Sequence, residues 1–369
     1  MSHPAPHEQI MALTVGFWQS RALAVAAELE LADALAGGPL GLMELASRVE
    51  ANPAMLRRLL RALETVGIFQ QPSTDVFSNT ETSETLRRNV PGSQWAWVIS
   101  ELSPNCGIYE LWSTLSSVVR TGEAHPEQVL GTSFWGFLKQ EPKAGRTFAL
   151  AMQEVAQAMT PAVTAAYNWR DAEFLVDVGG GIGSQLIDIL EHYPRSRGIL
   201  LDEPHVLAGA LQHDRLESRS GDFFQEVPEG ADLYLMRNVL HDWSDEKAAA
   251  ILSTVRKAAK PEAKLVLAEM VLPDGPKFSL GKWADLLMAV VFTGGKERTE
   301  AEYEQLLMST GWRLDRSLPT QSALRLIVAT TSRVRAAFDE STRRQVLNSS
   351  LLGRLISYDE RTVIHRRPK

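Results

Sequence analysis

Short apolar runs and amphipathic segments alternate through the second half of the chain. The apolar runs are rich in β-branched and aromatic residues, which is typical of strands. They cover residues 174–178, 198–202, 231–243 and 263–273. We expect a further strand at GDFF, residues 221–224, and helices between the strands, as at residues 245–257. This order predicts an α/β fold with a doubly wound, Rossmann-like parallel sheet whose ligands bind at the carboxyl ends of the strands.

The last two apolar runs predict how the sheet closes. They lie near residues 312–317 and 323–329, and the short connection between them contains Pro319. A parallel crossover needs a longer connection. We therefore expect an antiparallel hairpin at the end of the sheet.

The first part of the chain has a helical pattern. Residues 9–35 carry apolar positions at helical spacing, and two short helices split by Asn52 and Pro53 follow, with a hairpin over residues 69–79. The apolar face of the first helix includes Phe17, Leu23, Ala27 and Leu31. This is the outline of a winged helix, a shape that also occurs in DNA-binding proteins.

Charge and composition limit the possible partners and compartments. Arg57, Arg58 and Arg61 form a basic cluster in the winged helix, but the whole chain has a net charge of −7, which repels nucleic acid. With 44% hydrophobic residues, 369 residues can form two domains with cores of their own. The single cysteine, Cys106, fits a reducing compartment. We find no apolar run of membrane-spanning length, no leader and no metal-ligand spacing, and we expect a cytoplasmic protein without a metal.

A glycine-rich turn follows the first strand and predicts a nucleoside site. In FLVDVGGGIG, Asp177 precedes Gly179, Gly181 and Gly183, so a ligand can approach bare backbone. The spacing departs from G-x-G-x-x-G, and no phosphate-binding lysine follows, which disfavours a dinucleotide or a nucleoside triphosphate. Asp202 ends the next strand, where a carboxylate can accept hydrogen bonds from a ribose diol. The alternative for Asp202 is a solvated acid at a strand end.

Six runs between Val176 and Thr299 resemble one enzyme family. They are VDVGGGIG, LDEPHV, GDFF, HDWSDE, LAEMVLP and GGKERT. Their order resembles the S-adenosylmethionine-dependent small-molecule O-methyltransferases of the caffeic acid and hydroxyindole type, including bacterial members of secondary metabolism. The resemblance implies methyl transfer from S-adenosylmethionine to a phenolic or other aromatic-type hydroxyl of a small acceptor, and a homodimer without nucleic acid or membrane partners.

The resemblance also implies a domain division. It places a winged-helix dimerisation and substrate-cap domain at residues 1–160 and a cofactor-binding catalytic domain at residues 161–331. Residues 332–369 form a basic tail without a counterpart in the family. From residue 333 onward the tail has nine Lys or Arg against four Asp or Glu, and we interpret it as a solvated appendage or a segment that lies on the acidic body of its own subunit.

The family's catalytic residues match His241, Glu269 and Glu297. A phenol has a pKa near ~10 and must lose its proton during methyl transfer, so a histidine base is useful. The two acids would fix the tautomer of the imidazole and stabilise its cation. The alternatives are a polar residue at a helix start for His241 and an exposed capping segment for Glu297.

The cofactor residues implied by the family extend beyond the glycine turn. Asp177 would face the methionine ammonium, Asp222 the amine of the adenine and Phe223 the adenine ring. Arg237 stands where many members have lysine, and its cation would lie near the methionine portion.

An apolar cavity is expected for the acceptor, because the reaction gains from alignment and from exclusion of water. The candidates are Phe148, Met152, Met288 and Phe292, for which ordinary core packing is the alternative. Asp242 would either contact the acceptor or cap the helix that begins near Ser244. Val155 and Ala156 replace polar residues of plant members, so a phenylpropanoid acceptor is in doubt.

Two other functions are considered for the chain. One is a family member that binds the cofactor but does other chemistry, such as hydroxylation. The other is a cofactor-sensing regulator that uses the winged helix to bind DNA.

Overall fold

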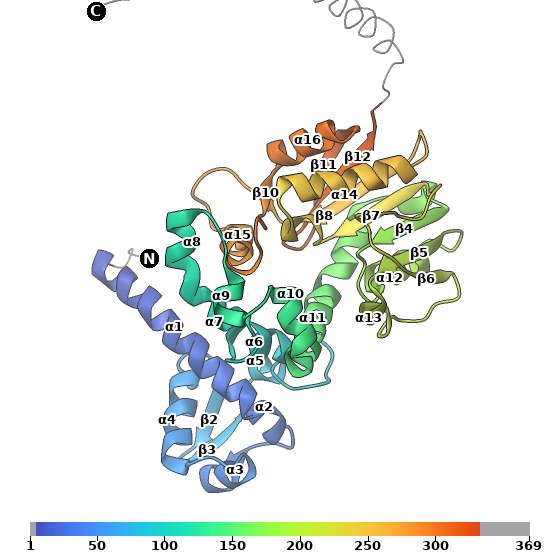
Figure 1. Ribbon diagram of the computed structural model, residues 1–369. Helices are drawn as coiled ribbons and strands as arrows, with labels where there is room; N and C mark the ends of the chain where they lie inside the picture. Colours follow the sequence, from blue (N-terminus) through green and yellow to red (C-terminus); the bar gives the residue numbers. More distant parts are fainter. Residues whose placement is uncertain (1–4, 333–369) are drawn as a thin grey trace, which may run out of the picture. The chain divides into compact units, whose positions relative to one another are not determined.

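The computed structural model describes residues 5–332 of the chain, and the basic tail lies outside these residues. Residues up to Thr331 form one compact unit (Figure 1). The expectation for the tail is therefore not addressed by the structure.

A seven-stranded sheet organises the second half of this unit. Its order is β11-β12-β8-β7-β4-β5-β6, in which β6 to β8 run parallel and β12 and β11 pair antiparallel. The strands are β4 (Phe174–Val178), β5 (Arg197–Asp202), β6 (Leu216–Ser220), β7 (Leu233–Arg237), β8 (Lys264–Glu269), β11 (Trp312–Pro319) and β12 (Arg325–Thr331). The chain winds outward from β4 in both directions, so the topological switch point lies between β4 and β7. This confirms the predicted doubly wound sheet and its closing hairpin.

Helices cover both faces of the sheet and bury two apolar clusters. One cluster packs the sheet against α14 (Asp245–Ala258) and α16 (Glu300–Ser309). The other packs it against α12 (Ser184–His192) and the end of α11 (Pro142–Ala166). The remaining elements around the sheet are η2 (Trp169–Asp171), α13 (Pro204–Leu207), η3 (Leu240–Asp242), and the two-stranded pair β9 (Val271–Leu272) and β10 (Arg298–Thr299).

The N-terminal part forms a separate core on a winged-helix plan. A three-stranded antiparallel sheet of order β1-β3-β2 packs against the helices. Its elements are α1 (Pro6–Glu28), α2 (Leu31–Ala34), β1 (Leu40–Gly41), α3 (Leu42–Arg48), α4 (Pro53–Glu64), β2 (Phe69–Ser73), β3 (Val76–Asn79) and α5 (Glu81–Glu84). Asn52, which the sequence places between the two helices, caps α4 by accepting a hydrogen bond from Met55 N.

Short helices lie between the two parts. They are α6 (Trp95–Leu102), α7 (Ile108–Leu111), η1 (Trp112–Thr114), α8 (Leu115–Thr121), α9 (Pro126–Leu130) and α10 (Phe134–Gln140), with α15 (Leu280–Val291) packed against several of them. α11 contacts α6 through its middle, at Glu154, and α12 nearer its end, where Thr160 and Thr164 lie against Gln185. It therefore reaches from the winged helix to the cofactor side of the sheet.

Two expectations about elements are wrong. GDFF at residues 221–224 is a turn, because the strand β6 ends one residue before it at Ser220. The chain also has an apolar segment of membrane-spanning length: α1 has 23 residues, a mean hydropathy of 1.3 over 18 residues, and only 17% of that window is buried. Thr14 and the polar run Gln19–Arg21 interrupt its apolar residues, so no unbroken apolar run marks it in the sequence.

Candidate active site

The turn between β4 and α12 brings bare backbone to the switch point of the sheet. Gly179, Gly181 and Gly183 have φ values of 69°, 63° and 87°. Residues with a side chain rarely adopt this backbone region. Gly180 has a negative φ, but a Cβ there would overlap the Asp177 carboxylate. Backbone conformation and space together explain the glycines at 179, 180, 181 and 183 of this turn.

Asp202 is fixed at the edge of this turn. Its carboxylate accepts hydrogen bonds from Gly181 N at 2.8 Å and from Glu203 N at 2.7 Å. The pKa of Asp202 is raised overall, because the effect of burial exceeds the lowering by these two backbone donors. The donors orient both oxygens and leave lone pairs for a further hydrogen-bond donor.

Asp177 is a buried carboxylate beside a half-buried cation. Its side chain is 1% exposed, and within residues 5–332 neither oxygen has a hydrogen-bond partner. Burial raises the pKa of Asp177 to about 7, and the nearby Arg237 opposes this rise. Arg237 Nη1 donates to Thr160 Oγ1 at 2.8 Å and to Gln185 Oε1 at 3.1 Å.

Thr160 and Gln185 were not anticipated from the sequence. Gln185 lies in the first turn of α12, directly after the glycine turn. This position in the sequence could have identified it as a candidate site residue. Thr160 lies in α11, far from the motifs in sequence, and no local pattern marks it.

Phe223 and Asp222 lie in the turn after β6. A Cβ added to Gly179 would lie 3.6 Å from the ring of Phe223, so this ring borders the glycine turn. The ring also packs against Phe224 and Trp243, with centroids 5.1 and 6.3 Å away. The Asp222 carboxylate is exposed and accepts hydrogen bonds from Phe224 N and Gln225 Nε2.

His241 lies in η3, directly beyond the carboxyl end of β7. The side chain is 14% exposed, and its Nδ1 lies 2.8 Å from Glu297 Oε1. Its Nε2 lies 3.4 Å from Asp242 Oδ1. An Nδ1–H that donates to the carboxylate leaves Nε2 as the proton-accepting nitrogen.

Glu269 supports the same turn through the backbone. It is fully buried at the end of β8, and its Oε1 accepts hydrogen bonds from Val239 N at 3.2 Å and Leu240 N at 3.0 Å. One ligand atom from each of His241, Glu269 and Glu297 lies within 4.8 Å of the others. A metal could use such a cluster, and the absence of a metal remains an expectation.

The charges of this cluster raise several pKa values. Burial alone would lower the pKa of His241, but Asp242, Glu297 and Glu269 outweigh it and raise that pKa to about 10. Burial raises the pKa of Glu269 to about 7 and that of Asp242 to about 6, although His241 opposes both shifts. The imidazole is thus strongly basic in this setting.

The capping alternatives for two residues are wrong. Ser244 caps α14 by accepting from Lys247 N, whereas Asp242 turns toward His241. Thr299 and Glu302 form the capping box of α16, and the Glu297 side chain is 0% exposed.

The acceptor candidates divide into two groups. Phe148, Met288 and Phe292 pack in one apolar cluster with Phe134. Trp135, which sequence reasoning missed, stacks on Phe292 with centroids 5.5 Å apart and is 38% exposed. Met152 is not in this cluster and is 37% exposed.

Gly295 lies between the aromatic cluster and the turn that carries His241. A Cβ on Gly295 would lie 2.7 Å from Phe292 Cβ and 3.1 Å from the His241 carbonyl oxygen. The helix end that carries Phe292 therefore lies directly against the backbone of His241.

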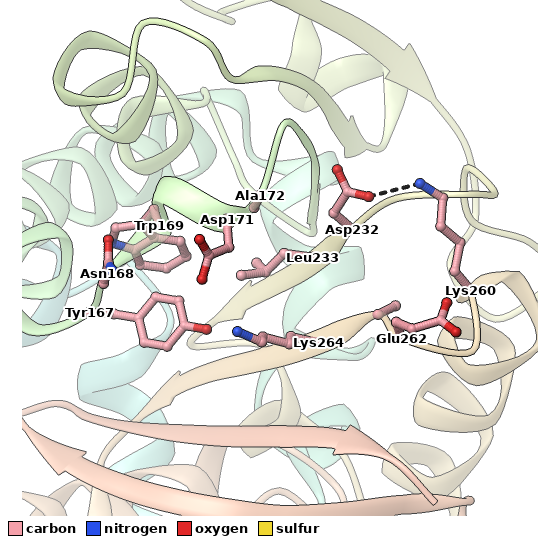
Figure 2. A pocket seen from close by; sticks show the side chains of 11 residues that line it. Tyr167, Asn168, Trp169, Asp171, Ala172, Asp232, Leu233, Lys260, Glu262 and Lys264 are labelled. Atoms are coloured by element: carbon pink, nitrogen blue, oxygen red, sulfur yellow. Dashed lines mark hydrogen bonds and ion pairs between the residues drawn. The ribbon is translucent and has the colours of Figure 1, made fainter. Parts of the chain in front are cut away.

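A cavity of about 280 Å³ lies away from these residues. Tyr167, Trp169, Asp232 and Lys264 are among its lining residues, and Asp232 pairs with Lys260 at its edge (Figure 2). Leu233 and Lys264 begin β7 and β8, so this cavity is at the amino end of the strands, whereas His241 and Glu269 follow their carboxyl ends. It takes no part in the site.

Comparison with known proteins identifies the family. The O-methyltransferase domain family matches residues 112–313, and the O-methyltransferase dimerisation domain matches residues 11–89. The chain belongs to the S-adenosylmethionine-dependent O-methyltransferases. The dimerisation domain supports a homodimer.

Similar proteins align with most of this chain and with nearly all of their own length. Phenazine O-methyltransferase of Lysobacter antibioticus is 36% identical, over 87% of this chain and 95% of that protein. Mitomycin biosynthesis 6-O-methyltransferase of Streptomyces lavendulae is 38% identical, over 85% and 91%. The crystal structure of human N-acetylserotonin methyltransferase in complex with S-adenosylmethionine is 27% identical, with a TM-score of 0.82 over 90% of this chain and 99% of that one.

The residues at the switch point fit S-adenosylmethionine, which is the cofactor of the family. The unpartnered, buried carboxylate of Asp177 suits a cation, and the fixed carboxylate of Asp202 suits a pair of hydroxyl donors. The glycine turn offers backbone without side chains, and the ring of Phe223 borders it.

Proposed function

We propose that the enzyme methylates a phenolic or similar aromatic hydroxyl of a small secondary metabolite, with His241 as the general base. The observation that carries this proposal is the imidazole–carboxylate pair of His241 and Glu297, which lies between the glycine turn and an aromatic cluster. S-adenosylmethionine supplies the electrophilic methyl group when it is bound. The residues of the chain provide the proton acceptor, the alignment and the apolar surroundings.

In this proposal His241 Nε2 accepts the proton of the acceptor hydroxyl. Its pKa of about 10 is close to that of a phenol, near ~10, so the proton can transfer at little cost in free energy. Glu297 fixes the tautomer and stabilises the imidazolium through its hydrogen bond to Nδ1. Glu269 holds the turn through Val239 N and Leu240 N rather than through the imidazole.

Each of the proposed cofactor residues would bind a different part of S-adenosylmethionine. Asp202 would bind the ribose hydroxyls, and Asp222 and Phe223 would bind the adenine. Asp177 would pair with the ammonium group, and Arg237, held by Thr160 and Gln185, would attract the carboxylate. The turn at Gly179, Gly181 and Gly183 would let the ligand approach the backbone.

The aromatic cluster favours a planar acceptor. Phe148, Met288 and Phe292, with Trp135 at the exposed edge, offer flat apolar surface next to the catalytic turn. Relatives named for phenazine and 3-amino-4-hydroxybenzoate act on aromatic rings, which supports the same class here. Asp242, beside Nε2, would contact the polar part of the acceptor, and Met152 would complete the pocket only if it turns inward.

We further propose the organisation that the sequence predicts. Residues 1–160 would serve dimerisation and cover the acceptor, and residues 161–331 would bind the cofactor. The enzyme would work in the cytoplasm, without nucleic acid or membrane partners.

The base assignment is tested by the substitution His241→Ala. We expect kcat to fall by about 10²- to 10⁴-fold, because general base catalysis contributes about this much, while the Kd for S-adenosylmethionine stays within about twofold. Turnover with isotopically labelled cofactor and a panel of phenols gives kcat, and calorimetry gives the Kd. His192→Ala is the control, since the His192 side chain on α12 is 62% exposed. Equal loss of turnover and cofactor affinity would remove the assignment.

A further inference from the structure

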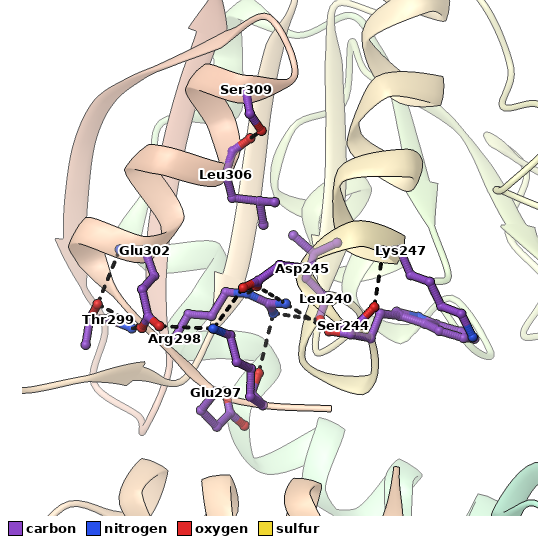
Figure 3. A network of polar contacts seen from close by, with 12 residues as sticks. Leu240, Ser244, Asp245, Lys247, Glu297, Arg298, Thr299, Glu302, Leu306 and Ser309 are labelled. Atoms are coloured by element: carbon purple, nitrogen blue, oxygen red, sulfur yellow. Dashed lines mark hydrogen bonds and ion pairs between the residues drawn. The ribbon is translucent and has the colours of Figure 1, made fainter. Parts of the chain in front are cut away.

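Arg298 is a fully buried arginine behind the catalytic turn. Its side chain is 0% exposed, although arginine is almost never fully buried unless it is paired. Nη1 donates to the Leu240 carbonyl at 2.8 Å, Nη2 to the Trp243 carbonyl at 2.8 Å, and Nε to Asp245 Oδ1 at 2.9 Å (Figure 3). These partners lie within residues 240–245, the segment that carries His241.

The backbone around Arg298 belongs to the rest of the site. Glu297 directly precedes it, and Lys296 N donates to the His241 carbonyl at 2.8 Å. Arg298 also pairs with Val271 in the β10–β9 pair, two residues after Glu269. Through its side chain and its backbone together, this one residue thus links the three segments that carry His241, Glu297 and Glu269.

We propose that Arg298 is a positioning residue that holds the His241 turn in register with Glu297. The inference rests on the proposed role of His241 as the base. The carbonyls of Leu240 and Trp243 flank His241, and the guanidinium ties both to the backbone next to Glu297. Without these bonds the turn can move away from β10, which lengthens the 2.8 Å contact between Nδ1 and Glu297 Oε1. A displacement of about 1 Å costs about 100-fold in rate.

The carbonyl bonds, rather than the ion pair, carry this role. The Asp245 side chain is 61% exposed and also pairs with Lys296 at 3.0 Å, and exposed ion pairs contribute little. The two carbonyl bonds need the planar fork of a guanidinium, which a lysine ammonium does not reproduce.

The test compares Arg298→Lys with the matched control Arg215→Lys. Arg215 also donates to backbone carbonyls, those of Leu190, Tyr193 and Ser196, but at the end of α12 away from His241. For Arg298→Lys we expect kcat to fall by about 10- to 100-fold with the KM for S-adenosylmethionine within about twofold. Arg215→Lys should keep the wild-type kcat per folded molecule.

A second readout reports the geometry without turnover. The Nδ1–H proton of His241 should give a downfield proton NMR signal, assigned by its loss in Glu297→Gln. We expect Arg298→Lys to shift or lose this signal and Arg215→Lys to keep it. If His241→Ala retained turnover, the base role would fail, yet a signal lost in Arg298→Lys would still support positioning.

Two results would overturn the proposal. The first is that Arg298→Lys keeps the wild-type kcat and an unchanged NMR signal. The second is that kcat falls equally in Arg298→Lys and Arg215→Lys, in proportion to the fall in their melting temperatures. Should Arg298→Lys not fold, Asp245→Asn decides, because it keeps both carbonyl bonds. Its kcat should fall by less than about threefold, and a fall as large as about 100-fold would contradict the role of the carbonyls.

Discussion

At His241, burial and charge act on the imidazole in opposite directions. Burial lowers its pKa, but three carboxylates nearby raise it to about 10. A base must be neutral before it accepts a proton, so a raised pKa shifts activity toward alkaline pH. In the proposed reaction the same carboxylates would stabilise the imidazolium, so the shift of activity to higher pH would accompany a stronger base.

This balance predicts the pH profile of Glu297→Gln. Removing one negative charge lowers the pKa of His241, so the acid limb of kcat against pH should move to lower pH by about 1 unit or more. The maximal kcat should fall as well, because Nδ1 loses its carboxylate partner. Steady-state rates from pH 6 to 10 measure both effects, with the exposed Glu191→Gln as control. An acid limb that stays in place would mean that another group titrates.

Single residues were predictable from the sequence where a family motif carries them. The structure brings His241, Glu269 and Glu297 together, as expected. The different hydrogen-bond partners of these residues could not be predicted from the sequence. Glu269 binds backbone N–H groups and Arg298 binds carbonyls. Backbone groups leave no trace in a residue pattern.

At the scale of elements, α11 joins the aromatic cluster proposed for the acceptor to the residues proposed for the cofactor. Phe148 near its start lies in the aromatic cluster, and Thr160 near its end holds Arg237. Between them, the Glu154 carboxylate accepts hydrogen bonds from Ser93 Oγ at 2.7 Å and Trp97 N at 2.9 Å at the start of α6. Helical periodicity predicts the existence of such a helix, but the partners of Glu154 depend on tertiary packing.

Glu154→Ala should therefore destabilise the protein. The carboxylate satisfies free N–H groups at the start of α6 and interacts favourably with the positive end of its dipole. We expect the free energy of unfolding to fall by about 1–3 kcal/mol, measured by urea denaturation. Gln157→Ala, at an exposed position of the same helix, is the control. A change of equal size in both variants would show that α11 as a helix, and not this cap, is responsible.

Elements with strong local patterns were predicted well, and those set by pairing were not. The β4 strand, α14 and the closing hairpin follow from apolar runs and turn lengths. β9 and β10 are two residues long and exist only through their pairing with each other. A strand of that length has no periodicity to recognise.

At the scale of the whole molecule, α1 presents an apolar face that the single chain does not bury. Ile10, Leu13 and Phe17 are 65%, 73% and 60% exposed, and they lie on one side of the helix at helical spacing. Exposed apolar surface of this kind marks an interaction site. The dimerisation domain begins at residue 11, which favours a second copy of the chain over a membrane as the partner of this face.

The substitutions Leu13→Glu and Phe17→Glu, made together, should separate the dimer. Burying each apolar side chain contributes about 1.5–3 kcal/mol, so the dimer should weaken by at least about 100-fold, and light scattering at micromolar concentration should report monomers. Met308→Glu, at a 65% exposed apolar position on α16, should leave the dimer intact. Flotation with lipid vesicles separates the two partners: if the wild-type protein floats with vesicles and the double variant does not, the face binds membrane and the dimer must use another surface.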